Sequence, residues 1–367
     1  MTNDNPLRIL QTFGQSIWLD DIHRGMLKNG DFQSYIDEDG ISGVTSIPAI
    51  LNKAILGHDD YDAPIARLAG EGKDARGIYE ELVIEDLRQA ADLLRPAYDE
   101  CEGRDGFVSM EVDPHLAHDS DKTVAAARRL WDLLDRPNIM IKVPATEAGL
   151  PAIRSLTAEG INVNATLLFS VSRYRDVAQS YINGIQDRVT EGLPVDRVAS
   201  VASFFLSRID MLVDRILEEK GDNQELHGKT AIAASRMAYQ AYWELIGGEQ
   251  WKTLSHAGAN PQRLLWASTS TKNPSYSDVM YVEPLIGDDT VNTLPLKTLD
   301  AYRDHGKPAL RISDDLEQSA ATIIELAGLG VDMEQVAQQL EDEGVAKFVQ
   351  PFDELLATLQ EKIEAVK

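Results

Sequence analysis

Short apolar runs alternate with amphipathic stretches along most of the chain. The short runs are rich in β-branched and aromatic residues, a pattern that predicts buried strands. The stretches between them repeat apolar residues every three or four positions, as at Leu87, Ala90 and Leu94 of Ile78–Leu94, and so predict helices. The predicted strands are Gln15–Asp20, Gly43–Ile47, Phe107–Val112, Ile139–Ala145, Ile161–Phe169, Ala199–Phe205, Arg263–Ser268 and Val279–Leu285. The other clear helical patterns are Asp121–Leu134, Ser172–Gly184, Ser207–Glu219 and Lys229–Leu245.

Strands that alternate with helices pair in parallel through right-handed crossovers, which predicts an α/β fold. Eight such units match a closed (β/α)8 TIM barrel better than an open sheet. No G-x-G-x-x-G sequence follows the first strand and the chain has no Walker-type loop, which disfavours dinucleotide-binding and P-loop folds. We expect a single domain over residues 1–367, with the barrel over about residues 15–320 and an extra N-terminal helix at Pro6–Phe13. The C-terminal tail, about residues 320–367, has an amphipathic helical pattern, and we expect it to pack on the outside of the barrel.

Composition and charge narrow the classes of partner. The formal net charge of -25 disfavours binding to nucleic acid or to an anionic membrane, since both attract clustered Lys and Arg. The single cysteine excludes an intramolecular disulfide, and the seven histidines show no metal-ligand spacing, so we expect neither a metal nor a cofactor. Met1–Pro6 lacks the pattern of a signal peptide and no uncharged apolar stretch could span a membrane, which makes the cytoplasm the expected location.

One lysine stands alone in an apolar run, Ile139-Met140-Ile141-Lys142-Val143-Pro144-Ala145-Thr146. A buried ammonium group is unfavourable, and burial lowers its pKa, which can turn the side chain into an amine nucleophile. The alternative is a lysine at a strand end that extends to solvent or pairs with a carboxylate. The run alone does not decide between these interpretations.

Polar residues at the ends of neighbouring strands favour the nucleophile. Asp20 ends the first predicted strand, Glu111 lies on the third, and Asn164 and Thr166 alternate with apolar residues on the fifth. Each has a structural explanation by itself, such as helix capping, but in a barrel these strand ends converge on one site. The set suits Schiff-base chemistry: Lys142 attacks a carbonyl, Glu111 or Asp20 moves protons, and Thr166 orients the water that leaves.

A local basic pocket is expected near the sixth and seventh strands. Arg208 begins a predicted helix, Lys272 follows the seventh strand, and Ser203 and Ser268 add hydroxyl groups. A guanidinium group at a helix start suits a phosphate. In so acidic a protein, this pocket fits a sugar phosphate better than a nucleic acid.

Several of these segments resemble the transaldolase family. They are Val108–Asp113, Ile141–Thr146, Gly160–Ser170, Ser200–Arg208 and Trp266–Thr269, and the resemblance extends from about Gln15 to Pro295. It implies a class I aldolase-like (β/α)8 barrel that transfers a dihydroxyacetone unit in the pentose phosphate pathway, from sedoheptulose 7-phosphate to glyceraldehyde 3-phosphate. It also implies that Lys142 forms the Schiff base and that Glu111, Asp20 and Thr166 transfer protons. The substrate contacts that it implies are Asn164, Ser203, Phe205, Arg208, Ser268 and, as a looser match, Lys272.

One position departs from the family pattern. Relatives usually read Thr-Thr-Asn-Pro or Thr-Ser-Asn-Pro at the end of the second strand, where this chain reads Thr45-Ser46-Ile47-Pro48. The family's asparagine is thought to hydrogen-bond the donor substrate, which Ile47 cannot do. We expect altered donor handling with the Schiff base retained; the alternative is that neighbouring groups have repacked around Ile47.

Two alternative functions remain open. One is a Schiff-base aldolase that acts on fructose 6-phosphate or free dihydroxyacetone. Phe205 favours transfer, because relatives that release the unit to water tend to carry a polar ring at this position. The other is a non-catalytic barrel that binds sugar phosphates, with Ile47 as a mark of decay. The sequence leaves the oligomeric state open between monomer and homodimer.

Overall fold

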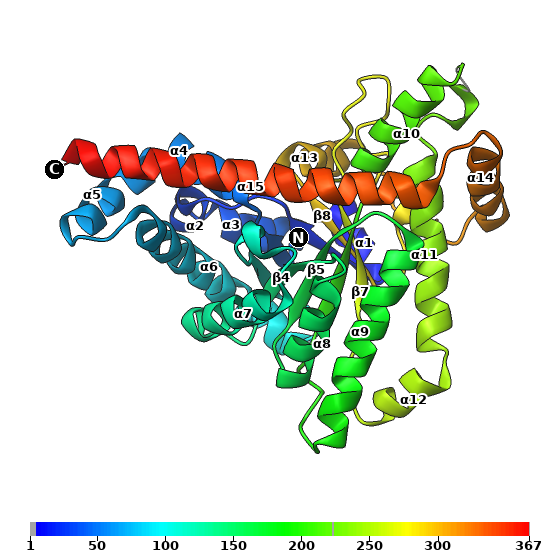
Figure 1. Cartoon of the computed structure of the whole chain (residues 1–367). Coiled ribbons are helices and arrows are strands. Elements are labelled where there is room, and N and C mark those ends of the chain that lie inside the picture. The colour runs from blue at the N-terminus through cyan, green and yellow to red at the C-terminus, as the bar shows by residue number, and fades with distance from the viewer. Residues whose placement is uncertain (1–4, 222–223, 367) are drawn as a thin grey trace.

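A closed barrel of eight parallel strands forms the centre of the molecule (Figure 1). The computed structural model describes residues 5–221 and 224–366. Met1–Asp4, part of the segment without a signal-peptide pattern, lie outside the described residues. Each strand pairs with its neighbours in the chain and β1 closes the barrel against β8, so the predicted (β/α)8 fold is confirmed. The strands are β1 Gln15–Leu19, β2 Gly43–Thr45, β3 Phe107–Glu111, β4 Ile139–Pro144, β5 Val163–Leu168, β6 Ser200–Phe205, β7 Arg263–Ala267 and β8 Thr290–Leu294.

Helices surround the barrel, and several begin at a side chain that caps the first turn. Asp119 accepts a hydrogen bond from the backbone N–H of Lys122, and Asp74 accepts one from Gly77, as expected of N-cap residues. The α-helices are α1 Pro6–Thr12, α2 Arg24–Asn29, α3 Asp31–Ser34, α4 Pro48–Gly57, α5 Asp62–Gly70, α6 Ala75–Glu100, α7 Ser120–Leu134, α8 Gly149–Glu159, α9 Val171–Thr190, α10 Ser207–Glu219, α11 Thr230–Ile246, α12 Glu249–His256, α13 Leu296–His305, α14 Leu316–Gly328 and α15 Met333–Val366. Shorter helical turns are η1 Tyr35–Asp39, η2 Asp59–Tyr61, η3 Pro114–Leu116, η4 Gln224–Leu226 and η5 Glu283–Leu285. Among the described helices, none is long and apolar enough to cross a membrane.

The eighth strand was predicted in the wrong place. Val279–Leu285 is a loop that ends in η5, and the strand that closes the barrel is β8, Thr290–Leu294. The apolar residues of the loop are buried, as those of a strand would be. Pro284, however, has no backbone N–H to donate to a neighbouring strand. β8 can be both polar and buried because two of its side chains form hydrogen bonds inside the fold. Asn292 donates to the Tyr281 carbonyl, and the hydroxyl of Thr293 bonds to that of a neighbouring threonine.

The C-terminal tail packs against the outer helices, α14 on α11 and α15 on α4, α5 and α6, and α15 also covers one end of the barrel. Figure 1 shows α15 (orange to red) extending across the molecule from α14 to the far side of α4 and α5. It contacts α4, α5, α6, α10 and β5. Gly344 and Phe348 of α15 approach Leu167 of β5 and Lys142 of β4, so the helix covers the carboxyl ends of the strands. In barrels of this type the functional site lies at that end.

Candidate functional site

Strand register brings three predicted site residues into one row inside the barrel. Glu111 of β3 is the register partner of Lys142 on β4, and Lys142 is the partner of Asn164 on β5. Neighbouring strands lie about 4.8 Å apart, and register partners in parallel strands point to the same face. The row therefore places an acid and an amide on either side of the lysine.

Lys142 is buried and its side chain lines a cavity of about 490 Å³. Burial lowers the pKa of its amine, Glu111 and Asp20 oppose that shift, and the guanidinium of Arg208 adds to it. The neutral amine is thus favoured more than in a solvated lysine. The other predicted residues that line this cavity are Asp20, Ser203, Phe205, Arg208, Ser268 and Lys272.

Glu111 lies behind this cavity and faces a smaller one. That cavity, about 150 Å³, is also lined by Tyr79 and Phe352. Neither carboxyl oxygen of Glu111 has a hydrogen-bond partner among the described residues. Burial raises the pKa of Glu111 to about 8, although Lys142 and Arg208 pull it down. The raised pKa favours the carboxylic acid form at neutral pH, and this form can donate a proton.

Asp20 follows β1 and is held by a threonine that the sequence analysis did not select. The hydroxyl of Thr45 donates to Oδ1 of Asp20 at 2.6 Å and lies 2.7 Å from the hydroxyl of Thr293. Burial raises the pKa of Asp20, while the bond from Thr45 and the charge of Lys142 lower it. The position of Thr45 at the end of β2 was the signal that could have identified it.

β5 is distorted beside Thr166. Its register against β6 shifts between Ala165 and Leu168, and Leu167 adopts a φ of 65°, a strained conformation for a branched side chain. The hydroxyl of Thr166 is buried and has no partner among the described residues. Such strain is typical of functional sites, and Thr166 is the register partner of Pro144, two residues beyond Lys142 on β4.

The amide of Asn164 is fixed by two serines. Its Nδ2 donates to Oγ of Ser109 at 3.0 Å, and its Oδ1 accepts from Oγ of Ser203 at 2.7 Å. One N–H of the amide remains for another partner. Ser203 lines the main cavity, whereas Asn164 lies behind it.

One side of the cavity is basic. Arg208, the second residue of α10, is partly buried and its Nη1 has no partner among the described residues. Lys272 is exposed and donates to Ser270 at 2.6 Å. Ser268, with a φ of 55°, lies 2.8 Å from the hydroxyl of Ser207. A buried guanidinium N–H without an acceptor is a strong binding group for an oxyanion.

Comparisons with known proteins agree with this geometry. The profile of one family, transaldolase/fructose-6-phosphate aldolase, matches residues 17–359. A protein named transaldolase from Trichodesmium erythraeum is 45% identical over 98% of both chains. One so named from Thiobacillus denitrificans is 46% identical over 97% of this chain and 99% of its own. Another from Saccharopolyspora erythraea is 45% identical over the full length of both chains.

The chain belongs to the transaldolase/fructose-6-phosphate aldolase family.

Within this family member, the loop that carries Lys272 is tied to α10 by two hydrogen-bonded pairs, one buried and one partly buried. The hydroxyl of Tyr281 donates to Asp210 at 2.8 Å, and that of Tyr276 donates to Asp214 at 2.6 Å. Burial raises the pKa of Asp210 to about 7. Because Asp210 lies on the same helix as Arg208, these bonds fix the two basic groups relative to one another.

The sequence analysis also missed two residues of α15. The ring of Phe348 lies 6.0 Å from Nζ of Lys142 and 6.0 Å from the guanidinium carbon of Arg208. Lys347 lines the main cavity and pairs with Glu343 at 3.0 Å. The amphipathic pattern of the tail predicts a helix with one buried face, but it does not identify the surface that this face covers.

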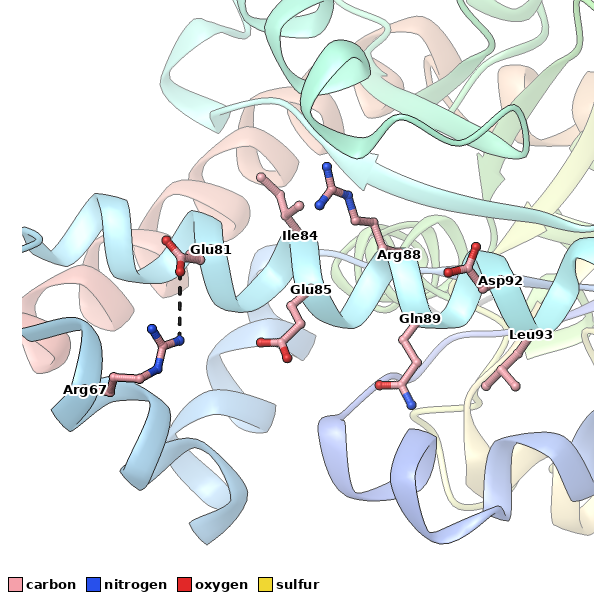
Figure 2. A pocket seen from close by; sticks show the side chains of 8 residues that line it. All are labelled: Arg67, Glu81, Ile84, Glu85, Arg88, Gln89, Asp92 and Leu93. Atoms are coloured by element: carbon pink, nitrogen blue, oxygen red, sulfur yellow. Dashed lines mark ion pairs between the residues drawn. The ribbon is translucent and has the colours of Figure 1, made fainter. Parts of the chain in front are cut away.

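A second groove, of about 580 Å³, lies away from the family's site. Figure 2 shows that Arg67 of α5 faces side chains along α6, with an ion pair of 3.9 Å to Glu81. The groove is lined by charged and amide side chains and by two apolar residues, Ile84 and Leu93. It lacks a buried amine, and among the described residues no group of three or more His, Cys, Asp or Glu could hold a metal ion.

Proposed function

We propose that this chain is a transaldolase that transfers a dihydroxyacetone unit between a phosphorylated ketose and a phosphorylated aldose. Sedoheptulose 7-phosphate and glyceraldehyde 3-phosphate would give erythrose 4-phosphate and fructose 6-phosphate. The observation that carries the proposal is the buried amine of Lys142 in register with the buried carboxyl group of Glu111, whose pKa is raised by burial. Family membership supports the same reaction.

The first half of the reaction forms the covalent bond. The neutral amine of Lys142 attacks the C2 carbonyl of the ketose, and the resulting carbinolamine must lose its hydroxyl as water. Glu111 supplies the proton for that loss. Since Glu111 does not line the main cavity, its proton passes through water held by the unpaired hydroxyl of Thr166. The product is an iminium ion on Lys142.

The second half moves the three-carbon unit. Asp20 lines the cavity and takes the proton of the C4 hydroxyl. The electron pair of the C3–C4 bond then moves into the iminium, which releases an aldose phosphate and leaves an enamine on Lys142. The enamine attacks the aldehyde of the acceptor, and Asp20 returns its proton to the new hydroxyl. Hydrolysis of the iminium frees the product ketose.

The basic side of the cavity binds the phosphate of either sugar. Arg208 and Lys272 supply charge, and Ser268 supplies a hydroxyl group. Phe205 is buried, and its ring lies 5.3 Å from the guanidinium carbon of Arg208. The intermediate therefore meets an apolar ring at this position and not a polar one. Asn164 and Ser203 orient the hydroxyls of the donor.

Reductive trapping tests the proposal. We expect incubation with fructose 6-phosphate and then borohydride to add mass to the peptide that contains Lys142, either that of the reduced sugar or, after release of the aldose phosphate, that of the reduced three-carbon unit. Absence of that adduct would contradict both enzymatic functions and favour a non-catalytic sugar-phosphate-binding barrel. Turnover that depends on an aldose acceptor separates transfer from cleavage of fructose 6-phosphate by an aldolase.

Ile47→Asn is expected to raise kcat/KM for the ketose donor about 10- to 100-fold, because a hydrogen bond to the reacting substrate contributes about 1–3 kcal/mol. Ile47 lines the cavity beside Lys142 and has only apolar atoms to offer the donor. It is also the N-cap of α4 and forms no capping bond, so the asparagine should add about 1 kcal/mol of stability. Steady-state kinetics with varied donor and thermal unfolding check both effects.

Ile47→Ala is the matched control, since it opens the same space without an amide. If Ile47→Asn and Ile47→Ala have the donor constants of the parent, neighbouring groups have repacked and the position is neutral.

The proposal also covers domain organisation, metabolic pathway and cellular location. We propose one domain over the whole chain, supported by the packing of α15 on elements from α4 to α10. We place its reaction in the pentose phosphate pathway, with sugar phosphates as its small-molecule partners. The cytoplasm is the proposed location, supported by the single cysteine, which is typical of a reducing compartment.

A further inference from the structure

We infer that Phe348 and Phe352 shield the amine of Lys142 and the carboxyl group of Glu111 from bulk water on the side that faces α15, and so act as positioning residues for the covalent step. This inference rests on the proposed function. It assigns the C-terminal helix a direct part in the chemistry, although the helix carries none of the reacting groups.

The two phenylalanines cover both members of the acid–amine pair. Phe348 is 1% exposed, and its ring lies 6.0 Å from Nζ of Lys142. Phe352, one helical turn further and 4% exposed, lines the small cavity of Glu111. It meets the ring of Tyr79 edge-on at 5.3 Å. Residues four apart on a helix share a face, so one face of α15 covers both groups.

Contacts along α15 hold this face against the barrel. A Cβ atom at Gly344 would lie 2.9 Å from Cδ2 of Leu167, so glycine permits the close approach of the helix to the distorted segment of β5. Further along, Nδ2 of Asn52 on α4 donates to the carbonyl of Pro351 at 2.9 Å. The helix is therefore fixed on both sides of Phe348.

The ring of Phe348 has two opposing effects on the amine. Its π-face attracts a cation, which would favour the charged form of Lys142, but 6.0 Å is at the outer limit of that interaction. The same ring lies 6.0 Å from the guanidinium carbon of Arg208, whose charge disfavours a second cation. Exclusion of water favours the neutral amine, and we assign it the larger effect. The charged groups that surround the amine, face Arg208 beside it or line the same cavity come from several elements. They are Asp20 after β1, Glu111 from β3, Arg208 from α10, Lys272 after β7, and Glu343 and Lys347 from α15.

The rate of adduct formation as a function of pH tests this inference. Protein and fructose 6-phosphate are mixed at pH 5 to 10, and aliquots are quenched into borohydride at one fixed pH, so that only Schiff-base formation depends on the variable. We compare the parent with Phe348→Ala, which admits water, and Phe348→Leu, which stays apolar but has no ring. Gln350→Ala, at an exposed position of α15, is the control.

Phe348→Ala should move the midpoint of adduct formation at least one pH unit higher, toward the ordinary lysine pKa of about 10.4. Where the rate of the parent still rises with pH, the rate of the variant should be about tenfold lower. The ratio of the two rates should approach one toward pH 10, where both proteins share the loss of the Glu111 proton, and this also shows that the variant is folded. Phe348→Leu and Gln350→Ala should keep the midpoint of the parent. Should Phe348→Ala not fold, Phe348→Val takes its place, with a smaller shift in the same direction.

Two results would overturn the inference. One is a parent-like midpoint for Phe348→Ala or Phe348→Val, and the other is a Phe348→Leu midpoint that shifts as far as that of the alanine variant. Failure of the proposed function looks different, because the parent itself would then form no adduct at any pH.

Discussion

Lys142→Met is expected to lower the turnover of fructose 6-phosphate with an aldose acceptor by about 10⁴-fold or more, because it removes the amine that forms the covalent intermediate. Methionine has nearly the length of lysine, so the cavity keeps its shape. Coupled-assay kinetics measure the loss, and mass spectrometry after borohydride treatment should show no adduct. Lys272→Met is the matched control, since it removes another lysine that lines the same cavity. It should raise KM for phosphorylated substrates and leave the adduct on Lys142.

The stability of Lys142→Met should move in the opposite direction from its activity. Burial lowers the pKa of Lys142, so the folded state binds fewer protons than the unfolded chain, and its stability falls as the pH drops from about 10 to the lowered pKa. Methionine has no such penalty and should raise the free energy of unfolding by about 1–3 kcal/mol at neutral pH. The gain should be larger at pH 6 than at pH 10. A variant that is less active and also less stable would indicate that Lys142 has a structural role instead.

The inner face of the barrel could be predicted from the sequence because its residues follow strand periodicity. Lys142, Glu111 and Asn164 alternate with apolar neighbours, and side chains of a strand that alternate in sequence share a face. A closed parallel barrel then brings the strand ends together. The catalytic and binding roles of these residues stay predictions, since geometry does not test them.

β8 could not be found in the same way. A buried strand is expected to be apolar, yet Asn292 and Thr293 of β8 are polar and form hydrogen bonds inside the fold, from Nδ2 of Asn292 to the Tyr281 carbonyl and between the hydroxyls of Thr293 and Thr45. The nearby loop at Val279–Leu285 is apolar because it packs under α10 and α11, with Tyr281 bonded to Asp210. Polarity inside the barrel and apolarity in a buried loop are both consequences of tertiary contacts, which a short window of sequence does not contain.

The contribution of α15 was missed for a related reason. Its amphipathic pattern predicts a helix with one buried face, but the pattern does not say which surface the face covers. Phe348 is more than two hundred positions from Lys142 along the chain and meets it only because the helix crosses the strand ends. The φ of 65° at Leu167 is likewise a result of packing, because a branched side chain does not favour that conformation.

Glu111→Gln is expected to lower kcat about 10²- to 10⁴-fold, the usual contribution of a general acid. The amide fills the same space but cannot donate the proton that expels water from the carbinolamine. The parent's activity should fall above pH 8, where Glu111 loses its proton, and this limb should be absent from the pH profile of the variant. Asp113→Asn is the control, since Asp113 lies on the same strand end but pairs with Arg76 away from Lys142.

The same substitution should make the protein more stable in alkaline solution. The pKa of Glu111 is raised from 4.5 to about 8 in the folded state, so its favourable contribution is complete below pH 4.5 and is lost as the pH rises through 8. Glutamine does not ionise, so Glu111→Gln and the parent should unfold at similar temperatures near pH 4.5 and diverge by pH 9, with the variant the more stable. Equal kcat in variant and parent would exclude Glu111 as the acid. Equal unfolding temperatures at pH 9 would mean that the carboxylate finds a partner in the folded state, because only a paired charge can be buried without this loss of stability.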